Sequence, residues 1–194
     1  MEISADVVVK GESNWSIDLA KRAIYPGTFD PVHYGHIDLM QRACAIFDEV
    51  IIAVFDHGQP SKTLLFGVGE RVALIEEALN GPPNLKVMPY SGLTVDFARK
   101  VNAQVIIRGL RVFSDFEFEF RMALANQRLA PEIEVVNLIT REEHTFLSGT
   151  IIREIASFGG DVSSMVPPHV AKSLKIRLSE GGANEYTTPL SLRD

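Results

Sequence analysis

The chain has 194 residues, 46% of them hydrophobic, and a formal net charge of −6. This length and apolar content predict one globular domain with a sizeable core, and the negative charge argues against broad binding to nucleic acid or to an anionic membrane. The single cysteine, Cys44, excludes an intrachain disulfide and is expected to fill the core. No apolar run is long enough to cross a membrane, and Glu2 and Asp6 stand where a signal peptide would be basic, so we expect a cytoplasmic protein.

Strand-like and helix-like runs alternate from residue 22 onward. Short apolar runs predict five strands, at residues 22–25, 50–55, 85–90, 105–107 and 134–139. Apolar residues at helical spacing predict helices at residues 37–47, 70–79, 94–101, 116–129, 148–156 and 170–178. The predicted fold is therefore α/β, a Rossmann-like open five-stranded parallel sheet with helices on both faces.

The two ends of the chain differ from this regular pattern. Residues 1–20 show no clear period and are treated as an extension of uncertain structure. Residues 21–179 form the predicted domain. The polar residues 180–194 are expected to form a disordered tail.

The segment YPGTFDPVHYGH at residues 25–36 joins the first predicted strand to the first predicted helix. Ligands of open α/β sheets bind at the carboxyl ends of strands, and the unpaired amides and positive dipole of a helix start favour an anion. Gly27 and Gly35 let the backbone approach a ligand closely. A nucleotide phosphate fits this description, so the segment is the predicted active site.

Side chains of the same segment have candidate roles. His33 and His36 would lie at the helix start, where an imidazole can donate hydrogen bonds to phosphoryl oxygens. Their ionisation stays open, because the helix dipole disfavours imidazolium while polyphosphate favours it. Asp30 is expected to cap the turn through an Asx-type bond.

Basic residues follow two other predicted strands. Lys62 comes after the second strand, and Arg108 and Arg111 come after the fourth, so all three are expected at the ligand-binding edge. Planar guanidinium groups suit phosphate. Alternatively, an arginine pairs with the acidic stretch that contains Asp115 and Glu119, and Lys62 is a solvated loop lysine. Glu119 could accept from a ribose hydroxyl, although an exposed helix carboxylate is the commoner outcome.

Ser148 opens a helix after the fifth predicted strand. It is a good N-cap, although its hydroxyl and the neighbouring amides could instead bind phosphates. His57, His144 and His169 stand singly, so no protein metal site is expected. No triad-like arrangement and no Walker-type loop is suggested.

Several segments together resemble bacterial phosphopantetheine adenylyltransferase. They are GTFDP with GH within residues 27–36, PSK at 60–62, and IRGLR followed by DFEFE within 107–119, in the same order and at nearly the same spacings. The similarity extends over roughly residues 22–178. The His-x-Gly-His element is shared with the wider nucleotidyltransferase superfamily and with class I aminoacyl-tRNA synthetases, whereas RGLR with DFEFE is far more particular.

The resemblance implies transfer of AMP from ATP to 4′-phosphopantetheine, with dephospho-coenzyme A and pyrophosphate as products. It also implies Mg²⁺, bound mainly through the ATP phosphates, and a homohexameric assembly. Since the constellation offers no protein nucleophile, we expect direct in-line attack without a covalent enzyme intermediate.

The resemblance also implies residue roles. His36 would stabilise the transition state, Thr28 and Lys62 would contact the acceptor phosphate and the reacting α-phosphate, and Arg108 would bind the acceptor phosphate. These four are the expected catalytic residues, and Thr94 would lie beside the pantetheine arm. The residues expected around ATP are Thr28, Phe29, His36, Gly109, Leu110, Arg111, Glu119, Thr145, Phe146, Leu147, Ser148, Gly149, Thr150 and Ile151.

The chain departs from the family pattern in three places. Gly149 stands where relatives often have a serine, the loop at residues 56–59 is longer than in some relatives, and both ends lack a counterpart. Two other functions are alternatives. One is a small nucleotidyltransferase that acts on nicotinate mononucleotide or glycerol phosphate, and the other is a catalytically silent nucleotide-binding module on the same fold.

Overall fold

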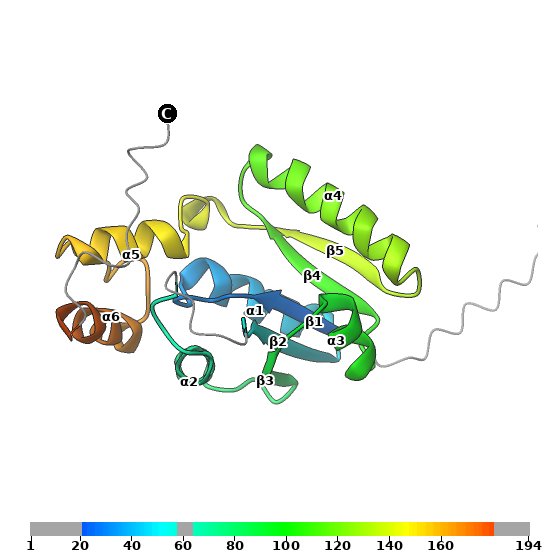
Figure 1. Cartoon of the computed structure of the whole chain (residues 1–194), viewed down its shortest axis with the longest axis horizontal. Coiled ribbons are helices and arrows are strands. Elements are labelled where there is room, and N and C mark those ends of the chain that lie inside the picture. Colours follow the sequence, from blue (N-terminus) through cyan, green and yellow to red (C-terminus); the bar gives the residue numbers. More distant parts are fainter. Residues whose placement is uncertain (1–20, 58–63, 181–194) are drawn as a thin grey trace, which may run out of the picture.

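A computed structural model describes residues 21–57 and 64–180 (Figure 1). The predicted extension at 1–20, the segment 58–63 with Lys62, and residues 181–194 of the predicted tail lie outside the described residues. The described chain forms one five-stranded parallel sheet in the order β3-β2-β1-β4-β5, which confirms the predicted fold. The strands are β1 (Arg22–Gly27), β2 (Glu49–Phe55), β3 (Leu85–Tyr90), β4 (Val105–Leu110) and β5 (Glu134–Ile139).

Six α-helices and a short 3-10 helix connect and cover the strands in the described part of the chain. The 3-10 helix η1 (Glu142–His144) was not predicted, and β4 runs beyond residue 107 because Arg108 to Leu110 continue to pair with β5. The last helix extends to residue 180, one residue into the predicted tail. The α-helices are α1 (Tyr34–Ile46), α2 (Val68–Leu79), α3 (Thr94–Lys100), α4 (Phe113–Leu129), α5 (Gly149–Ser157) and α6 (Pro168–Glu180).

Both faces of the sheet are buried, as the continuous apolar runs of the strands predict. On one face Ile52 and Ile107 belong to a core shared with α1, α2, α5 and α6. On the other face Ile51 and Ile106 pack with residues of α3. Because successive residues of a strand point to opposite faces, the two cores alternate along every central strand.

The strand order reverses direction at β1, which lies between β2 and β4. Chain connections leave β1 toward β2 and β3 on one side, and β4 and β5 follow on the other side. Such a reversal leaves a crevice at the carboxyl ends of the two central strands, where open α/β sheets bind ligands. The segment after β1 and the end of β4 meet at this point.

A buried guanidinium holds the loops on the β1–β2 side of this crevice. Arg71 of α2 is only 1% exposed. Its Nη1 donates to the carbonyls of Thr28 at 2.5 Å and Phe55 at 3.0 Å, and its Nε donates to the carbonyl of Phe66 at 3.1 Å. Burial lowers the pKa of Arg71, and the charges of nearby carboxylates oppose that shift. One side chain therefore ties three separate backbone segments together.

Asp30 complements this cation within the same region. Its carboxylate accepts from the amides of Leu65 at 2.8 Å and Phe66 at 3.0 Å, and lies 3.5 Å from Nη1 of Arg153 on α5. The predicted Asx-type cap is therefore wrong: the carboxylate binds amides more than thirty residues away in the chain instead of its own turn. Asp30 is nearly buried, so these bonds replace the water that it gives up on folding.

Arg71→Met is expected to destabilise the protein by about 3 kcal/mol or more, because three buried carbonyls lose their donor. Arg71→Lys keeps the charge but not the planar fork, and should lose less. Urea denaturation at one protein concentration measures both. Lys172→Met, at an exposed position of α6, is the control and should change stability by less than about 0.5 kcal/mol. A Met variant as stable as the control would show that the network is not needed for folding.

Candidate active site

A cavity of about 300 Å³ lies at the carboxyl ends of β1 and β4 and at the start of α1. It brings together residues that are far apart in the sequence, from the β1–α1 segment, β4, α4 and the start of α5. Of the residues predicted around ATP or for catalysis, those that line it are Phe29, His36, Arg108, Gly109, Arg111, Glu119, Ser148 and Gly149.

His36 projects from the first turn of α1 into this cavity. Its ring stacks on His33 with the centroids 3.6 Å apart, and the edge of Phe29 lies against it at 4.9 Å. The residue Phe29 has a φ of 52°, an uncommon backbone conformation for an aromatic residue and one that occurs at functional sites. Within the described residues, the Nδ1 of His36 is buried without a hydrogen-bond partner.

The surroundings of His36 favour its neutral form in the ligand-free chain. Burial, with the positive charge of Arg111 as the second cause, lowers the pKa of His36 to about 3. The imidazole of the ligand-free chain is therefore neutral at ordinary pH. A neutral imidazole can donate one hydrogen bond to a phosphoryl oxygen without adding a charge to the cavity.

His33 has a different position from His36. It is the N-cap of α1, and its Nδ1 accepts from the amide of His36 at 3.4 Å. The amide of Tyr34 donates to the carbonyl of Met165 at 3.0 Å. The prediction of unpaired amides in the first turn is therefore wrong for these two positions, because the histidine cap and a tertiary contact use them. The ring of His33 also lines the cavity, where it stacks against the ring of His36.

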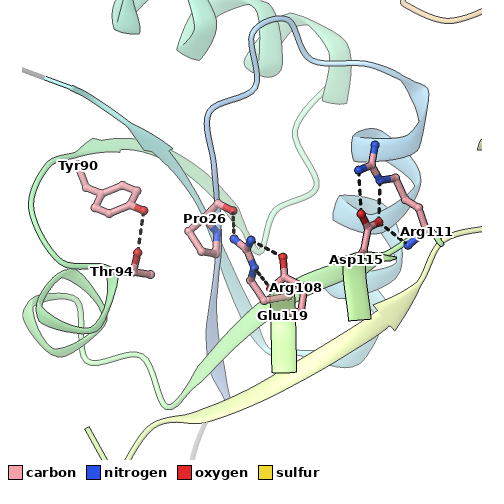
Figure 2. A network of polar contacts seen from close by, with 7 residues as sticks. All are labelled: Pro26, Tyr90, Thr94, Arg108, Arg111, Asp115 and Glu119. Carbon is pink, nitrogen blue, oxygen red and sulfur yellow. Dashed lines mark hydrogen bonds and ion pairs between the residues drawn. The ribbon is translucent and has the colours of Figure 1, made fainter. Parts of the chain in front are cut away.

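Arg108 forms a bidentate ion pair with Glu119 of α4 (Figure 2). Its Nε and Nη2 donate to the two carboxylate oxygens at 2.7 and 2.6 Å, and its Nη1 donates to the carbonyl of Pro26 at 3.3 Å. Burial opposes the charged form of Arg108, but the hydrogen bonds and charge of Glu119 outweigh it, so the pKa of Arg108 is raised. Glu119 is only 8% exposed, so the expectation of an exposed helix carboxylate is wrong.

Arg111 is paired in the same way with the first turn of α4. Its Nε and Nη2 lie 3.0 and 3.2 Å from the carboxylate of Asp115, and its Nη1 donates to the carbonyl of Leu147 at 2.9 Å. Figure 2 shows both arginines turned toward α4. The alternative of pairing with the acidic stretch thus describes both arginines in the ligand-free chain. The pairs hold two cations at the cavity wall before any anion enters.

The start of α5 also lines the cavity, through Ser148 and Gly149. Ser148 is the N-cap of this helix, since its Oγ accepts from the amide of Ile151 at 3.2 Å, so a residue of the cavity lining also caps α5. At Gly149 an added Cβ would lie 2.9 Å from the carbonyl oxygen of Asp30. The glycine lets α5 approach the β1–α1 segment closely, which accounts for the absence of a serine here.

Thr94 is the first residue of α3. Its hydroxyl lies 3.0 Å from the hydroxyl of Tyr90 (Figure 2). Lys62 lies outside the described residues, so its position is untested. The predicted residues that the structure describes but does not place in the cavity lining are Thr28, Thr94, Leu110, Thr145, Phe146, Leu147, Thr150 and Ile151.

Some residues of the site were missed in the sequence. Leu39, Thr140 and His144 line the cavity, and Arg71 fixes the carbonyl of Thr28 beneath it. Arg71 had a detectable signal, because it stands on the face of α2 that also carries Leu74, where helical period predicts apolar side chains. Thr140 and His144 had none, since their place depends on where β5, paired with β4, ends and on the 3-10 helix η1 that follows it.

Among residues 21–57 and 64–180, no group of three or more His, Cys, Asp or Glu side chains is placed to hold a metal ion. No helix within those ranges is long and apolar enough to span a bilayer.

Comparison with known proteins identifies the family of this chain. The model of the "Cytidylyltransferase-like" family matches residues 24–155. Proteins named phosphopantetheine adenylyltransferase from Roseiflexus sp. (strain RS-1) and Methylococcus capsulatus are both 53% identical, over 79% and 82% of this chain and 94% and 98% of their own. A solved bifunctional NMN adenylyltransferase/ADP ribose pyrophosphatase from Francisella tularensis shares the fold, with a TM-score of 0.66 at 16% identity over 85% of this chain and 51% of its own. The chain belongs to the phosphopantetheine adenylyltransferase family, within the cytidylyltransferase-like nucleotidyltransferases.

Proposed function

We propose that this protein transfers AMP from ATP to 4′-phosphopantetheine, producing dephospho-coenzyme A and pyrophosphate in coenzyme A biosynthesis. Family membership supports the reaction. The observation that carries it is a single cavity, at the reversal point of the sheet, in which a neutral His36 lies near Arg108 and Arg111. This combination suits two phosphate groups that must be brought together despite their like charges.

The reaction is a direct displacement. An oxygen of the acceptor phosphate attacks the α-phosphorus of ATP, and pyrophosphate leaves on the opposite side. The attacking oxygen is already deprotonated at neutral pH, so no general base is required. The catalytic contribution is positioning and charge stabilisation, as in other phosphoryl transfers.

His36 donates a hydrogen bond to the α-phosphate as negative charge develops there. Arg108 binds the acceptor phosphate, which competes with Glu119 for the same planar fork. Thr28 and Lys62 contact the acceptor phosphate and the α-phosphate. Thr94, beside Tyr90, contacts the pantetheine arm.

ATP occupies the side of the cavity toward β5 and α5. Phe29, Gly109 to Arg111, and the stretch from Thr145 to Ile151 surround it, with Glu119 as an acceptor for ribose. Mg²⁺ would be held mainly by the ATP phosphates, in keeping with a cavity wall where the described carboxylate, Glu119, is already paired. It would neutralise part of the phosphate charge. The reaction takes place in the cytoplasm.

Release of pyrophosphate from ATP, measured with and without 4′-phosphopantetheine, tests the function. We expect release only with this acceptor. Release with nicotinate mononucleotide or glycerol phosphate, and none with phosphopantetheine, would assign the chain to another reaction. Tight ATP binding without pyrophosphate release from any acceptor would indicate a silent nucleotide-binding module.

His36→Ala is expected to lower kcat by about 10²-fold or more and to change ATP affinity little, because the imidazole meets charge that develops in the transition state. Steady-state kinetics and calorimetry separate the two effects. His169→Ala, outside this cavity, is the control and should keep kcat. Equal losses in ATP binding and turnover would assign His36 to ground-state recognition.

The low pKa of His36 supplies a second readout for the same variant. Since the free enzyme holds the ring neutral, the profile of kcat/KM for ATP should contain no ionisation of His36 between about pH 5.5 and 8. Wild-type and His36→Ala profiles should therefore have the same shape. An inflection in this range that disappears in the variant would show that the imidazole is charged in the active enzyme.

Arg108→Ala should raise KM for phosphopantetheine and leave ATP affinity nearly unchanged. Loss of a charge-assisted contact costs about 1.5–3 kcal/mol, equivalent to about 10- to 100-fold in KM. Arg108→Ala with Glu119→Gln removes the carboxylate that the single variant would leave unpaired, and it should show the same KM effect. A collapse of ATP binding in Arg108→Ala and in the double variant, but not in Glu119→Gln alone, would mean that Arg108 serves the nucleotide.

We propose a homohexamer as the assembly, and α4 supports an interface between copies. Many large apolar side chains of this helix are exposed, and Figure 1 shows it along the β4–β5 side of the molecule. The ring of Phe116 stacks at 6.4 Å from Phe113 and 5.9 Å from Phe120, which forms an apolar stripe along the helix. Contiguous apolar patches of this kind mark contact surfaces.

Phe116→Lys is therefore expected to dissociate the assembly, because it places a charge at the centre of the stripe. Light scattering should give the mass of six chains of 21.5 kDa for the wild type and a smaller mass for the variant. Phe158→Lys is the control, since Phe158 is 76% exposed at the end of α5, away from α4. An unchanged mass for Phe116→Lys would exclude this stripe as the contact.

A further inference from the structure

The cavity contains a buried hydroxyl to which the proposed reaction gives no role. Thr140 follows β5 directly and is only 5% exposed. Its amide donates to the carbonyl of Leu110 at 2.8 Å, so its backbone is held against the end of β4. Its Oγ1, in contrast, has no hydrogen-bond partner within the part of the chain that the structure describes.

A buried hydroxyl without a partner loses its hydration and gains nothing in return. Among residues 21–57 and 64–180, two buried side-chain polar atoms are in this condition, Thr140 Oγ1 and His36 Nδ1. Both residues line the same cavity. Their coincidence at one place makes this cavity wall the part of the described chain where buried side-chain polar groups stay unsatisfied.

The nearest surroundings of Thr140 Oγ1 carry no formal charge. Gly109 on the neighbouring strand lets Leu39 pack closely there, because an added Cβ would lie 2.6 Å from Leu39 Cδ1 and 4.0 Å from Thr140 Oγ1. The hydroxyl of Tyr25 lies 3.7 Å from the same point. An apolar side chain, bare backbone and two hydroxyls thus meet on this wall.

We propose that the Thr140 hydroxyl hydrogen-bonds the nucleoside half of the bound nucleotide and so contributes to nucleotide affinity. The inference rests on the nucleotide site of the proposed function. A hydroxyl both donates and accepts, which suits the edge of a nucleobase or a ribose hydroxyl. The phosphates have the guanidinium groups of Arg108 and Arg111 as partners of opposite charge.

Thr140→Val tests the inference, because valine keeps the shape of threonine and replaces only the hydroxyl by a methyl group. Calorimetry of the full chain with ATP, without acceptor, should show affinity weakened by about 3- to 10-fold, the effect of one neutral hydrogen bond. Affinity for inorganic tripolyphosphate should not change. The thermal midpoint of the ligand-free protein should stay the same or rise, since an unpaired buried hydroxyl is removed.

Thr140→Ser is the matched control, because it keeps the hydroxyl and should keep ATP affinity. Unchanged ATP affinity in Thr140→Val would overturn the proposal, and so would a lowered thermal midpoint without any effect on binding, which would reveal a partner within the protein. An equal loss for tripolyphosphate would move the contact to the phosphates and also overturn it. If the wild type bound no ATP, the proposed function itself would fail, whereas wild-type binding with an unaffected valine variant would refute only the role of Thr140.

Discussion

Buried charges at the carboxyl edge of the sheet must find partners within the protein, and the rest of the site depends on how they do so. Arg71 cannot reach water, so it binds the carbonyls of three backbone segments. Asp30 binds two amides of one of those segments for the same reason. The loops that carry Thr28 and Phe29 are thereby ordered by hydrogen bonds that would be expensive to leave unmade. The sheet supplies the position of the site, and these two charges supply its rigidity.

The same constraint shapes the chemistry that we propose. Burial of the imidazole, with the charge of Arg111 beside it, keeps His36 neutral. In the absence of ligand, the carboxylates of α4 satisfy the arginines and hold their side chains in place. An incoming phosphate then meets donors that are already oriented, so little reorganisation is left for the reaction step.

Helix α4 serves two surfaces at once. Asp115 and Glu119 pair with the arginines of the cavity wall, while the stripe that includes Phe116 is open to solvent. In the proposed hexamer, packing of that stripe against another copy would also restrain the carboxylates on the adjacent side of the helix, since Phe116 and Glu119 are three residues apart. Assembly and the position of Arg108 would then depend on one element.

The spacing of apolar residues and the residues typical of turns predicted the five strands and six α-helices of the described chain. Strands β3 and β5 have the predicted bounds, and Ser148 is the N-cap that its place before an apolar run indicates. These features depend on neighbours within a few residues, which a sequence displays directly. The His-x-Gly-His and RGLR segments likewise marked His36, Arg108 and Arg111 for the cavity, because the first follows β1, the second spans the end of β4, and the carboxyl ends of both strands share one edge.

Long-range partners were decided only by the tertiary structure. Asp30 was expected to cap its own turn and instead binds Leu65 and Phe66, and Thr140 enters the cavity without any local pattern. The pairing of both arginines and the low pKa of His36 also depend on which groups from distant segments become buried together. The sequence by itself determined the order of elements and the edge where the site lies, since periodicity and strand direction are local properties. Which polar groups are satisfied within the protein and which stay open for a ligand was settled by packing, because burial is a property of the whole fold.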